Sequence, residues 1–254
     1  MRMPDKASPR VVPDDLTVCV TSCGRLDLLK RTLDSFCSLH PGGRIIISED
    51  SADPGVVKRV KEAYPRIDVV AGLERLGQMR SIDRLFSLVE TPYLFHLEDD
   101  WLFDGTVDWQ AAKELLAARD DVANVSVRAF SEIKPKYRDR AEVIVTAEGA
   151  KFHLMRRDAH PEFFGWSNNP GLMRTQLYRD YAPFGRMRHD QMSALIKNDG
   201  RREAYLLPGV AHHIGQDRNV ADPTMPPRPK SKVAKWLRWA KKRLYYSGLR
   251  KEPF

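Results

Sequence analysis

The sequence predicts an α/β fold in which a mixed, mostly parallel sheet is flanked by helices and followed by an amphipathic C-terminal helix. Three observations support this fold class. Apolar, β-branched segments alternate with helical patterns along the first hundred residues, as in parallel sheets with right-handed crossovers. The segment Arg44–Ser48 is almost continuously apolar, which is typical of a strand covered on both faces. The 254 residues show no obvious internal repeat and suit one domain with a short tail.

Apolar periodicity places the elements of the first half. Residues 27–39 gather leucine and phenylalanine side chains on one side of a helix. Asp53 followed by Pro54 is a favourable helix start, because proline suits the first helical position. The expected strands are 16–21, 44–48, 67–70 and 93–97, and the expected helices are 27–39, 54–64 and 77–89.

The second half is more mixed. Phe163–Pro170 is an aromatic loop rich in glycine and asparagine. The expected helices are 109–119, 175–181 and 190–198, and the expected strands are 122–130, 142–147, 204–207 and 210–214. The predicted organisation is a flexible arm at 1–15, a domain at 16–216 with halves 16–104 and 105–216, and a proline-rich linker with a basic tail at 217–254.

Composition argues against several classes of protein. No segment reaches the roughly 20 uninterrupted apolar residues that cross a bilayer, and Met1–Asp15 lacks the apolar centre of a secretion signal. Cys19, Cys23 and Cys37 describe neither a disulfide framework nor a zinc site, so we interpret them as thiols in a reducing cytoplasm. The expected location is cytoplasmic.

The net charge of +8 is concentrated at the C-terminus. Residues 228–254 contain ten Lys or Arg and one Glu, so the rest of the chain carries a net charge of −1. A partner attracted by basicity therefore belongs to the tail. No helix-turn-helix, zinc-finger or RNA-binding pattern is visible, and we expect no nucleic-acid partner.

Three predicted strands end in polar clusters: Thr21-Ser22, Glu49-Asp50-Ser51 and Glu98-Asp99-Asp100. In parallel sheets, ligands bind beyond the carboxyl ends of the strands, so these clusters should share one rim. Three adjacent carboxylates repel one another, and a cation relieves that repulsion. Oxygen ligands of this kind suit Mg²⁺ or Mn²⁺ bridging to substrate phosphates. A solvated acidic turn is the simpler alternative, and the position at a strand end favours the metal site.

At these positions the chain resembles the family 2 glycosyltransferases, which have the GT-A fold of nucleotide-diphospho-sugar transferases. The similarity covers roughly residues 16–215 and rests on the order and spacing of several motifs. These motifs are Val18-Cys-Val-Thr-Ser-Cys-Gly-Arg25, Ile47-Ser-Glu-Asp-Ser51, Arg75-Leu-Gly77-Gln-Met-Arg80, Tyr93-Leu-Phe-His-Leu-Glu-Asp-Asp100 and Asn169-Pro-Gly171.

The resemblance implies roles for individual residues on the donor side. Thr21 and Asp50 would contact the nucleotide base and ribose, and Arg25 would also bind the donor. Arg80 would reach the diphosphate, with Arg84 as its competitor. The Asp-X-Asp motif of the family corresponds to Glu98-Asp99-Asp100, in which Glu98 and Asp100 would hold Mn²⁺ or Mg²⁺ with Asp99 between them.

The second half supplies the remaining candidates. Asp190 resembles in position the acidic residue that the family uses as a general base, and a plain helix-capping acid is the alternative. His189 is its local rival, because histidine is a competent base near neutral pH. The resemblance also implies a histidine for the metal or diphosphate, and His213, in preference to His212, is the expected third metal ligand. A surface histidine pair at a strand end is the alternative. The loop residues expected to contact the acceptor are Trp166, Asn168 and Asn169, and a tryptophan buried in the loop core is the alternative for Trp166.

Residues 231–246 have the pattern of an amphipathic helix. Apolar residues recur at the 3.6-residue period, with Trp236 among them, and basic residues cover the remaining sides. This composition is typical of an interfacial helix on anionic lipid, which would suit a lipid-linked acceptor and peripheral attachment to the inner face of the membrane. The alternative is a C-terminal helix packed on the domain with a solvated basic face.

The function expected from these features is metal-dependent, inverting transfer of a sugar from a nucleotide-diphospho-sugar to a saccharide or lipid-linked acceptor. Such a reaction would serve surface polysaccharide or glycolipid synthesis. A nucleotidyltransferase of related fold is the alternative, although Ser22-Cys-Gly-Arg25 is too sparse for the glycine-rich, basic segment that class needs. A catalytically inactive relative is disfavoured, because Asp50, the acidic cluster and Asp190 are all present.

Overall fold

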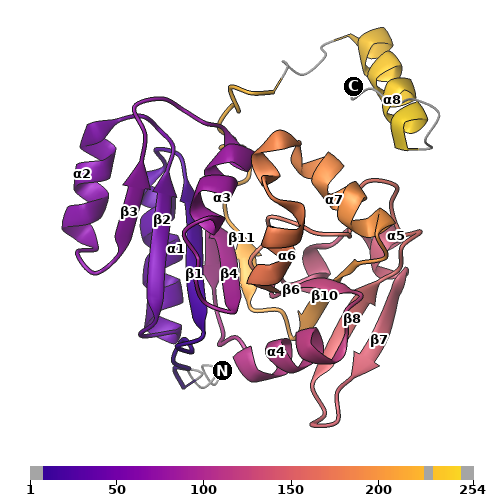
Figure 1. The fold of residues 1–254 in the computed structure, drawn as a ribbon, viewed down its shortest axis with the longest axis horizontal. Helices are drawn as coiled ribbons and strands as arrows, with labels where there is room; N and C mark the ends of the chain where they lie inside the picture. Colours follow the sequence, from indigo (N-terminus) through magenta and orange to yellow (C-terminus); the bar gives the residue numbers. More distant parts are fainter. Residues whose placement is uncertain (1–7, 226–230, 247–254) are drawn as a thin grey trace, which may run out of the picture.

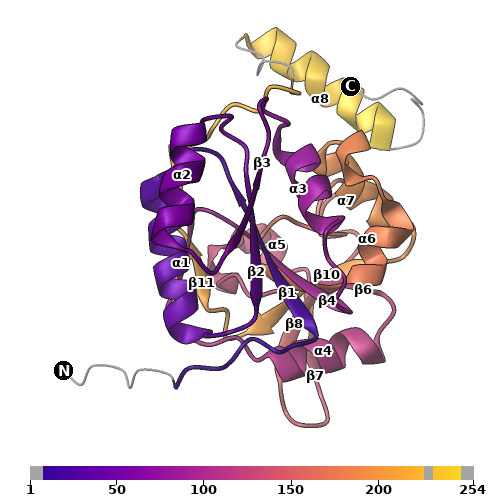
Figure 2. The same ribbon diagram turned by 60° about the vertical axis from the view of Figure 1, so that its left-hand side comes forward.

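The computed structural model describes residues 8–225 and 231–246, which form a mixed sheet with helices on both faces (Figures 1 and 2). The main sheet contains β1 (Leu16–Ser22), β2 (Arg44–Glu49), β3 (Asp68–Ala71), β4 (Tyr93–Glu98), β6 (Val122–Ser126), β7 (Ala141–Val145), β8 (Lys151–Met155), β9 (Gly171–Arg174) and β10 (Arg202–Leu207). Its nine strands follow the order β3-β2-β1-β4-β9-β6-β10-β8-β7.

The first half of the sheet is parallel, as the alternation of strands and helices predicts. β1 pairs with β2 and β4, with Val20 opposite Ile47 on one side and Leu97 on the other. Every residue of β1 is buried, because helices cover both faces. These parallel strands end at one edge, where their polar clusters lie.

The helices are α1 (Leu26–Leu39), α2 (Pro54–Ala63), α3 (Gln78–Phe86), α4 (Trp109–Ala118), α5 (Pro135–Arg138), α6 (Thr175–Tyr181), α7 (His189–Asn198) and α8 (Lys232–Tyr246), with two short 3₁₀ turns, η1 (Phe130–Glu132) and η2 (Phe184–Arg186). The predicted start of α2 is confirmed, since the Asp53 carboxylate accepts a hydrogen bond from the Gly55 amide at 2.8 Å.

Two hydrophobic cores lie on opposite faces of the sheet. Side chains from α1, α2 and α4 fill one core, and side chains from α3, α6 and α7 fill the other. Alternate residues of a strand point to opposite faces, so Val18 and Val20 enter the first core while Cys19 enters the second. Figure 2 shows the two helix layers on either side of the strands.

Several strands escaped prediction. β9 lies between β4 and β6 and runs antiparallel to both, which makes the sheet mixed. β5 (Trp101–Phe103) was also not predicted. It pairs with β11 (Ala211–His213), which lies within the strand expected at 210–214, in a separate two-stranded sheet next to the acidic cluster. The segment expected as one strand at 122–130 ends at Ser126, where the chain turns toward η1.

The segments outside the domain are attached to it. The arm expected to be flexible lies against the body from Arg10 onward, where the Arg10 amide donates to the Leu39 carbonyl and Val12 is fully buried; residues 1–7 lie outside the described residues. The linker is also held, because Arg75 donates to the Ala221 carbonyl at 2.6 Å. Residues 226–230 lie outside the described residues, and α8 then stands beside the body, above α7 in Figure 1.

Candidate functional site

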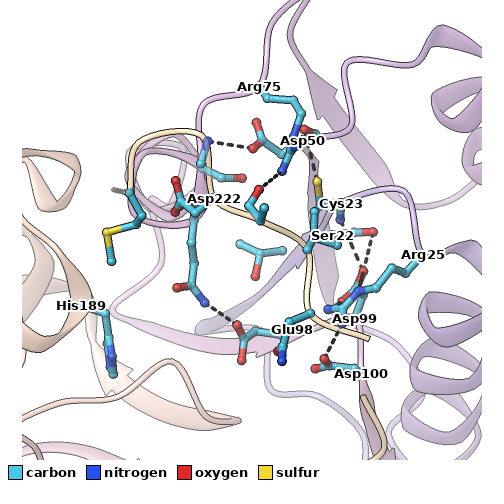
Figure 3. Close-up of a pocket in the computed structure, with 18 of the residues that line it drawn as sticks. Ser22, Cys23, Arg25, Asp50, Arg75, Glu98, Asp99, Asp100, His189 and Asp222 are labelled. Atoms are coloured by element: carbon cyan, nitrogen blue, oxygen red, sulfur yellow. Dashed lines mark hydrogen bonds and ion pairs between the residues drawn. The ribbon is translucent and has the colours of Figure 1, made fainter. Parts of the chain in front are cut away.

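The carboxyl ends of the parallel strands open into a cavity of about 820 Å³. Figure 3 shows its walls, with the acidic cluster on one side and His189 on the other. The cavity brings together eight of the residues predicted for the site: Thr21, Arg25, Asp50, Glu98, Asp99, Asp100, Asp190 and His213. Four others are not part of its lining: Arg80, Trp166, Asn168 and Asn169.

Arg25 joins the two aspartates of the acidic cluster. Its guanidinium contacts the Asp99 carboxylate and donates to Asp100 Oδ2 at 2.8 Å. Asp99 also accepts from the Ser22 hydroxyl at 3.1 Å. Burial raises the pKa of Asp99 to about 6, and the Arg25 charge limits the rise. Asp99 is therefore held from several sides by the protein itself.

Asp100 has a different environment from Asp99. Burial alone would raise its pKa, but the hydrogen bond from His213 and the charge of Arg25 hold the pKa below its ordinary value. Its Oδ1 atom is buried and has no hydrogen-bond partner among the described residues. A buried carboxylate oxygen without a donor can accept a bond from a cation or a ligand.

Glu98 ends β4 and accepts a hydrogen bond from Gln78 Nε2 at 2.6 Å. Burial of its carboxyl group and the neighbouring charge of Asp100 raise the pKa of Glu98 to about 7. Glu98 therefore holds its proton more readily than an ordinary glutamate. A cation on this side of the cluster would favour its ionised form.

The two histidines of β11 point in opposite directions, as successive residues of a strand do. His213 Nε2 lies 3.4 Å from Asp100 Oδ2, and its ring lies 5.2 Å from the ring of Trp101 on β5. The hydrogen bond to Asp100 raises the pKa of His213. His212 is directed away from the acidic cluster, toward Glu132 at 3.2 Å and Asp104 at 3.0 Å.

Asp50 links β2 to the start of α3. Its two carboxylate oxygens accept from the backbone amides of Leu76 at 2.8 Å and Gly77 at 2.9 Å. Gly77 has φ of +81°, a conformation that side chains rarely adopt. Thr21 Oγ1 lies 3.2 Å from His96 Nε2 at the base of the cavity.

Arg75 lines the cavity together with Arg25 and Arg238, and sequence reasoning gave it no role. Arg75 precedes α3 and lines the cavity, whereas Arg80 is exposed on α3 and lies beside Gly185. Arg84 points to the sheet and donates to the Ser48 hydroxyl at 2.7 Å. The position of Arg75 after the third parallel strand could have identified it, because such loops face the ligand.

The predicted acceptor loop is mostly buried. Trp166 is 1% exposed, and its ring packs edge-on against Phe184 at 5.0 Å. Asn168 is buried, and Asn169 accepts a hydrogen bond from Arg128 at 3.4 Å. Phe163 is the aromatic residue of this loop that reaches the cavity. The sequence of the loop did not show which of its aromatic side chains would be buried and which would line the cavity.

Asp190 is the second residue of α7 and lies among cations. It accepts from Arg188 Nε and Nη2, each at 3.0 Å, and from Lys242 at 2.9 Å. Burial would raise the pKa of Asp190, but Arg188 and Lys242 outweigh it and lower the pKa to about 2. For the neighbouring His189, burial itself lowers the pKa, to about 4, because it disfavours the charged imidazolium.

The donor atoms for a metal ion form an incomplete set. Within residues 8–225 and 231–246, no group of three or more His, Cys, Asp or Glu side chains is arranged to hold a metal ion alone. Asp100 Oδ1, which has no partner there, and the His213 imidazole are suitable ligands for Mn²⁺ or Mg²⁺. The residues therefore fit an ion whose remaining ligands come from substrate oxygens, as is common for Mg²⁺.

Comparison with known proteins gives a family and a set of structural neighbours. The model of Glycosyl transferase family 2 matches residues 17–180. A search of curated proteins finds no match.

Three solved structures illustrate the structural similarity. S. aureus TarS 1–349 in complex with UDP-GlcNAc aligns with a TM-score of 0.56 and 11% identity, over 90% of this chain and 66% of that chain. GalNAc-T7 with UDP, GalNAc and Mn²⁺ gives 0.54 and 12%, over 91% and 50%. The mannosyltransferase PcManGT from Pyrobaculum calidifontis with GDP-Man and Mn²⁺ gives 0.50 and 15%, over 98% and 69%.

These similarities establish the GT-A fold predicted from the sequence. The chain spans 57% of the length of another TarS 1–349 structure, so that protein has considerable additional chain. At identities of 11–15%, the shared feature is the fold.

Proposed function

The chain belongs to glycosyl transferase family 2, and from this premise we propose that it is a metal-dependent, inverting glycosyltransferase. It would move a hexosyl or related group from a nucleotide-diphospho-sugar to a saccharide or lipid-linked acceptor, in the synthesis of a surface polysaccharide or glycolipid. The observation that carries the proposal is that Thr21, Asp50, the acidic cluster and Asp190 all line the same cavity.

The donor would occupy the side of the cavity formed by β1, β2 and β4. Thr21 and Asp50 would contact the base and ribose, with Asp50 oriented by the Leu76 and Gly77 amides. Arg25, and Arg75 in the place first expected for Arg80, would supply positive charge to the diphosphate. The solved structures of GalNAc-T7 and PcManGT contain nucleotides or nucleotide-sugars with Mn²⁺, which supports this class of donor.

Asp100 and His213 would hold the metal ion, and Glu98 would complete the protein's share of the ligands. A bound Mn²⁺ or Mg²⁺ stabilises the negative charge that develops on a departing diphosphate. Arg25 orients Asp100 through Oδ2 and leaves Oδ1 for the ion. Asp99, held by Arg25 and Ser22, would keep the cluster in place.

Asp190 would act as the general base on the other side of the sugar. Figure 3 shows His189, its neighbour in sequence, on the wall opposite the acidic cluster. A base at that position takes the proton of an acceptor hydroxyl that attacks opposite the leaving diphosphate, which inverts the anomeric centre. Phe163, whose ring lies 6.1 Å from that of His189, also lines the cavity and would contact the acceptor in the role first expected for Trp166.

Thermal shift with nucleoside diphosphates tests this proposal. UDP, GDP, ADP and CDP would be tested separately. We expect one of these four nucleotides to raise the melting temperature of the protein when Mn²⁺ is present. Ligand at 100 times its Kd stabilises by about 2.7 kcal/mol, which corresponds to roughly 5–10 °C for a domain of this size. EDTA should abolish the shift. If no nucleotide shifts the transition with or without metal, the proposal is wrong.

We also propose that α8 binds an anionic membrane surface. Its large apolar side chains are exposed: Val233 68%, Trp236 61%, Leu237 47% and Leu244 45%. Among the less exposed positions of α8, Ala234, Arg238, Lys242 and Tyr245 share another side of the helix, and Ala240 is the one small residue on the apolar side. This is unlike a tail helix that packs its apolar stripe on the domain.

The other features of α8 suit an interfacial helix. Basic side chains beside an exposed tryptophan and aliphatic stripe favour the headgroup region of anionic lipid. No helix in the described parts of the chain is long and apolar enough to span a membrane. The attachment that we propose is peripheral, on the inner face, and would bring the cavity near a lipid-linked acceptor.

Sedimentation with liposomes tests the membrane proposal. The full chain should pellet with vesicles containing about 30% phosphatidylserine, while a chain ending at Pro229 should stay in the supernatant, because most basic residues are removed. Trp236→Glu should weaken pelleting at least ~10-fold. Val143→Glu, at an exposed apolar residue of β7, is the matched control. Equal pelleting of the full and shortened chains would refute the proposal.

A further inference from the structure

Lys242 of α8 reaches into the cavity and contacts two acids from separate segments. Its Nζ atom lies 2.7 Å from Glu162 Oε2 and 2.9 Å from Asp190 Oδ2. The Lys242 side chain is 23% exposed, and each carboxylate is 12% exposed. These contacts join the tail helix to the residue that we propose as the general base.

The Asp190 carboxylate is saturated with donors in this arrangement. Oδ1 accepts from Arg188 Nε at 3.0 Å and from the Gln191 amide at 3.1 Å. Oδ2 accepts from Arg188 Nη2 at 3.0 Å and from Lys242 at 2.9 Å. A carboxylate has about four acceptor positions. An acceptor hydroxyl can therefore donate to Asp190 only after one of these donors leaves.

Lys242 is the donor best placed to leave. Arg188 and the Gln191 amide belong to the start of the same helix as Asp190, so their positions are fixed locally. Lys242 comes from a separate helix, 52 residues further along the chain, and has a flexible four-carbon stem. Its second partner, Glu162, can retain the ammonium group when Asp190 is released.

We propose that Lys242 guards the base: it occupies the position of the acceptor hydroxyl on Asp190 until an acceptor displaces it. The guard would keep water from serving as the acceptor while the donor is bound. This inference rests on the proposed function, because it requires Asp190 to be the base.

The reaction that the guard suppresses is hydrolysis of the donor. A water molecule at Asp190 Oδ2 gives its proton to the carboxylate while its oxygen attacks the anomeric carbon. The bond between that carbon and the diphosphate oxygen breaks, and the electron pair leaves with the nucleoside diphosphate. The products are the free sugar and the nucleoside diphosphate.

Donor hydrolysis without acceptor measures the guard directly. Release of nucleoside diphosphate would be followed with UDP-GlcNAc, UDP-glucose and GDP-mannose in Mn²⁺, for the full chain and its variants. We expect Lys242→Ala to raise the hydrolysis rate about tenfold, the effect of removing one charged hydrogen bond. Lys242→Arg should restore a low rate. Lys241→Ala, at the exposed neighbour on the same helix, should leave the rate unchanged.

Two further measurements separate the guard from other effects. Lys242→Ala combined with Asp190→Asn should lose the whole gain, because the gain acts through the base. Backbone hydrogen exchange in residues 232–246 should be faster in Lys242→Ala than in Lys241→Ala, which reports the ion pairs without any donor.

The outcomes distinguish this inference from the proposed function. If a donor binds and Lys242→Ala hydrolyses it at the wild-type rate, the guard is refuted while the glycosyltransferase assignment stands. Unchanged exchange in α8 would also refute it, because Lys242 would then not hold the helix. If no nucleoside diphosphate shifts the melting temperature and none of the three donors binds or reacts, the proposed function fails and the guard fails with it.

Discussion

Asp100→Asn is expected to lose the Mn²⁺-dependent response to nucleotide and to slow transfer by about 10³-fold, the typical cost of removing a group that stabilises transition-state charge. Asparagine keeps the size of the side chain but removes the negative charge. Its amide nitrogen would also meet donors, since Arg25 lies 2.8 Å and His213 3.4 Å from Asp100 Oδ2. Release of nucleoside diphosphate and thermal shift with and without Mn²⁺ measure the two effects.

Asp99→Asn is the informative comparison for this prediction. The Asp99 carboxylate is already bound by Arg25, Ser22 and the Cys23 amide. Its replacement should lower thermal stability but leave the Mn²⁺-dependent shift in place. If the shift instead survives in Asp100→Asn and disappears in Asp99→Asn, the metal ligand in the cluster has been assigned to the wrong residue.

The sequence predicted the parallel half of the sheet because local patterns determine it. β1 and β2 are short apolar runs between turn residues, and both appear within a residue of their expected bounds. β9 is four residues long and pairs antiparallel with β4 and β6. Such a strand is defined by distant partners, which a local pattern does not reveal. The same reason explains why β5 was missed, since it is three residues long and pairs with β11.

The donor side of the candidate site was more predictable than the acceptor side. Strand ends of a parallel sheet meet by topology, so Thr21, Asp50 and the acidic cluster were placed together from sequence. Arg80 does not line the cavity with them, because it lies on another side of its helix. Gln78 lines the cavity, and Arg80 is two positions later, about 200° further around the helix.

Acceptor-side residues depend on how loops and the tail fold over the sheet. Trp166 is buried because η2 brings Phe184 against it. Lys197 fixes the same loop by donating to the backbone carbonyls of Pro161 and Phe163, at 2.7 and 3.2 Å, and this leaves Phe163 on the cavity wall. Lys242 approaches Asp190 only through the placement of α8. The local sequence around each of these residues does not reveal its partner, because the partner lies in a distant segment.

Asp190→Asn is expected to reduce transfer by about 10³–10⁴-fold, because the proposed general base can no longer accept a proton. Nucleotide binding should persist, with an unchanged Mn²⁺-dependent thermal shift, since His189, the neighbour of Asp190 in sequence, lies across the cavity from the acidic cluster in Figure 3. Transfer to a membrane fraction and the thermal shift are the two measurements. A variant that transfers sugar at the wild-type rate would eliminate Asp190 as the base.

Glu162→Gln provides the matched control for Asp190→Asn. Both changes remove one carboxylate from Lys242, so both should loosen α8, but only Asp190→Asn removes the base. The folded-state pKa of Asp190 is about 2, against an ordinary value of 3.8. Asp190 therefore contributes stability above pH 3.8 that is lost as the pH falls through 2, and Asp190→Asn removes this contribution at neutral pH. Because Asp190 stays ionised from about pH 5 to 8, a fall in the transfer rate of the wild-type protein within that range would have to come from another group.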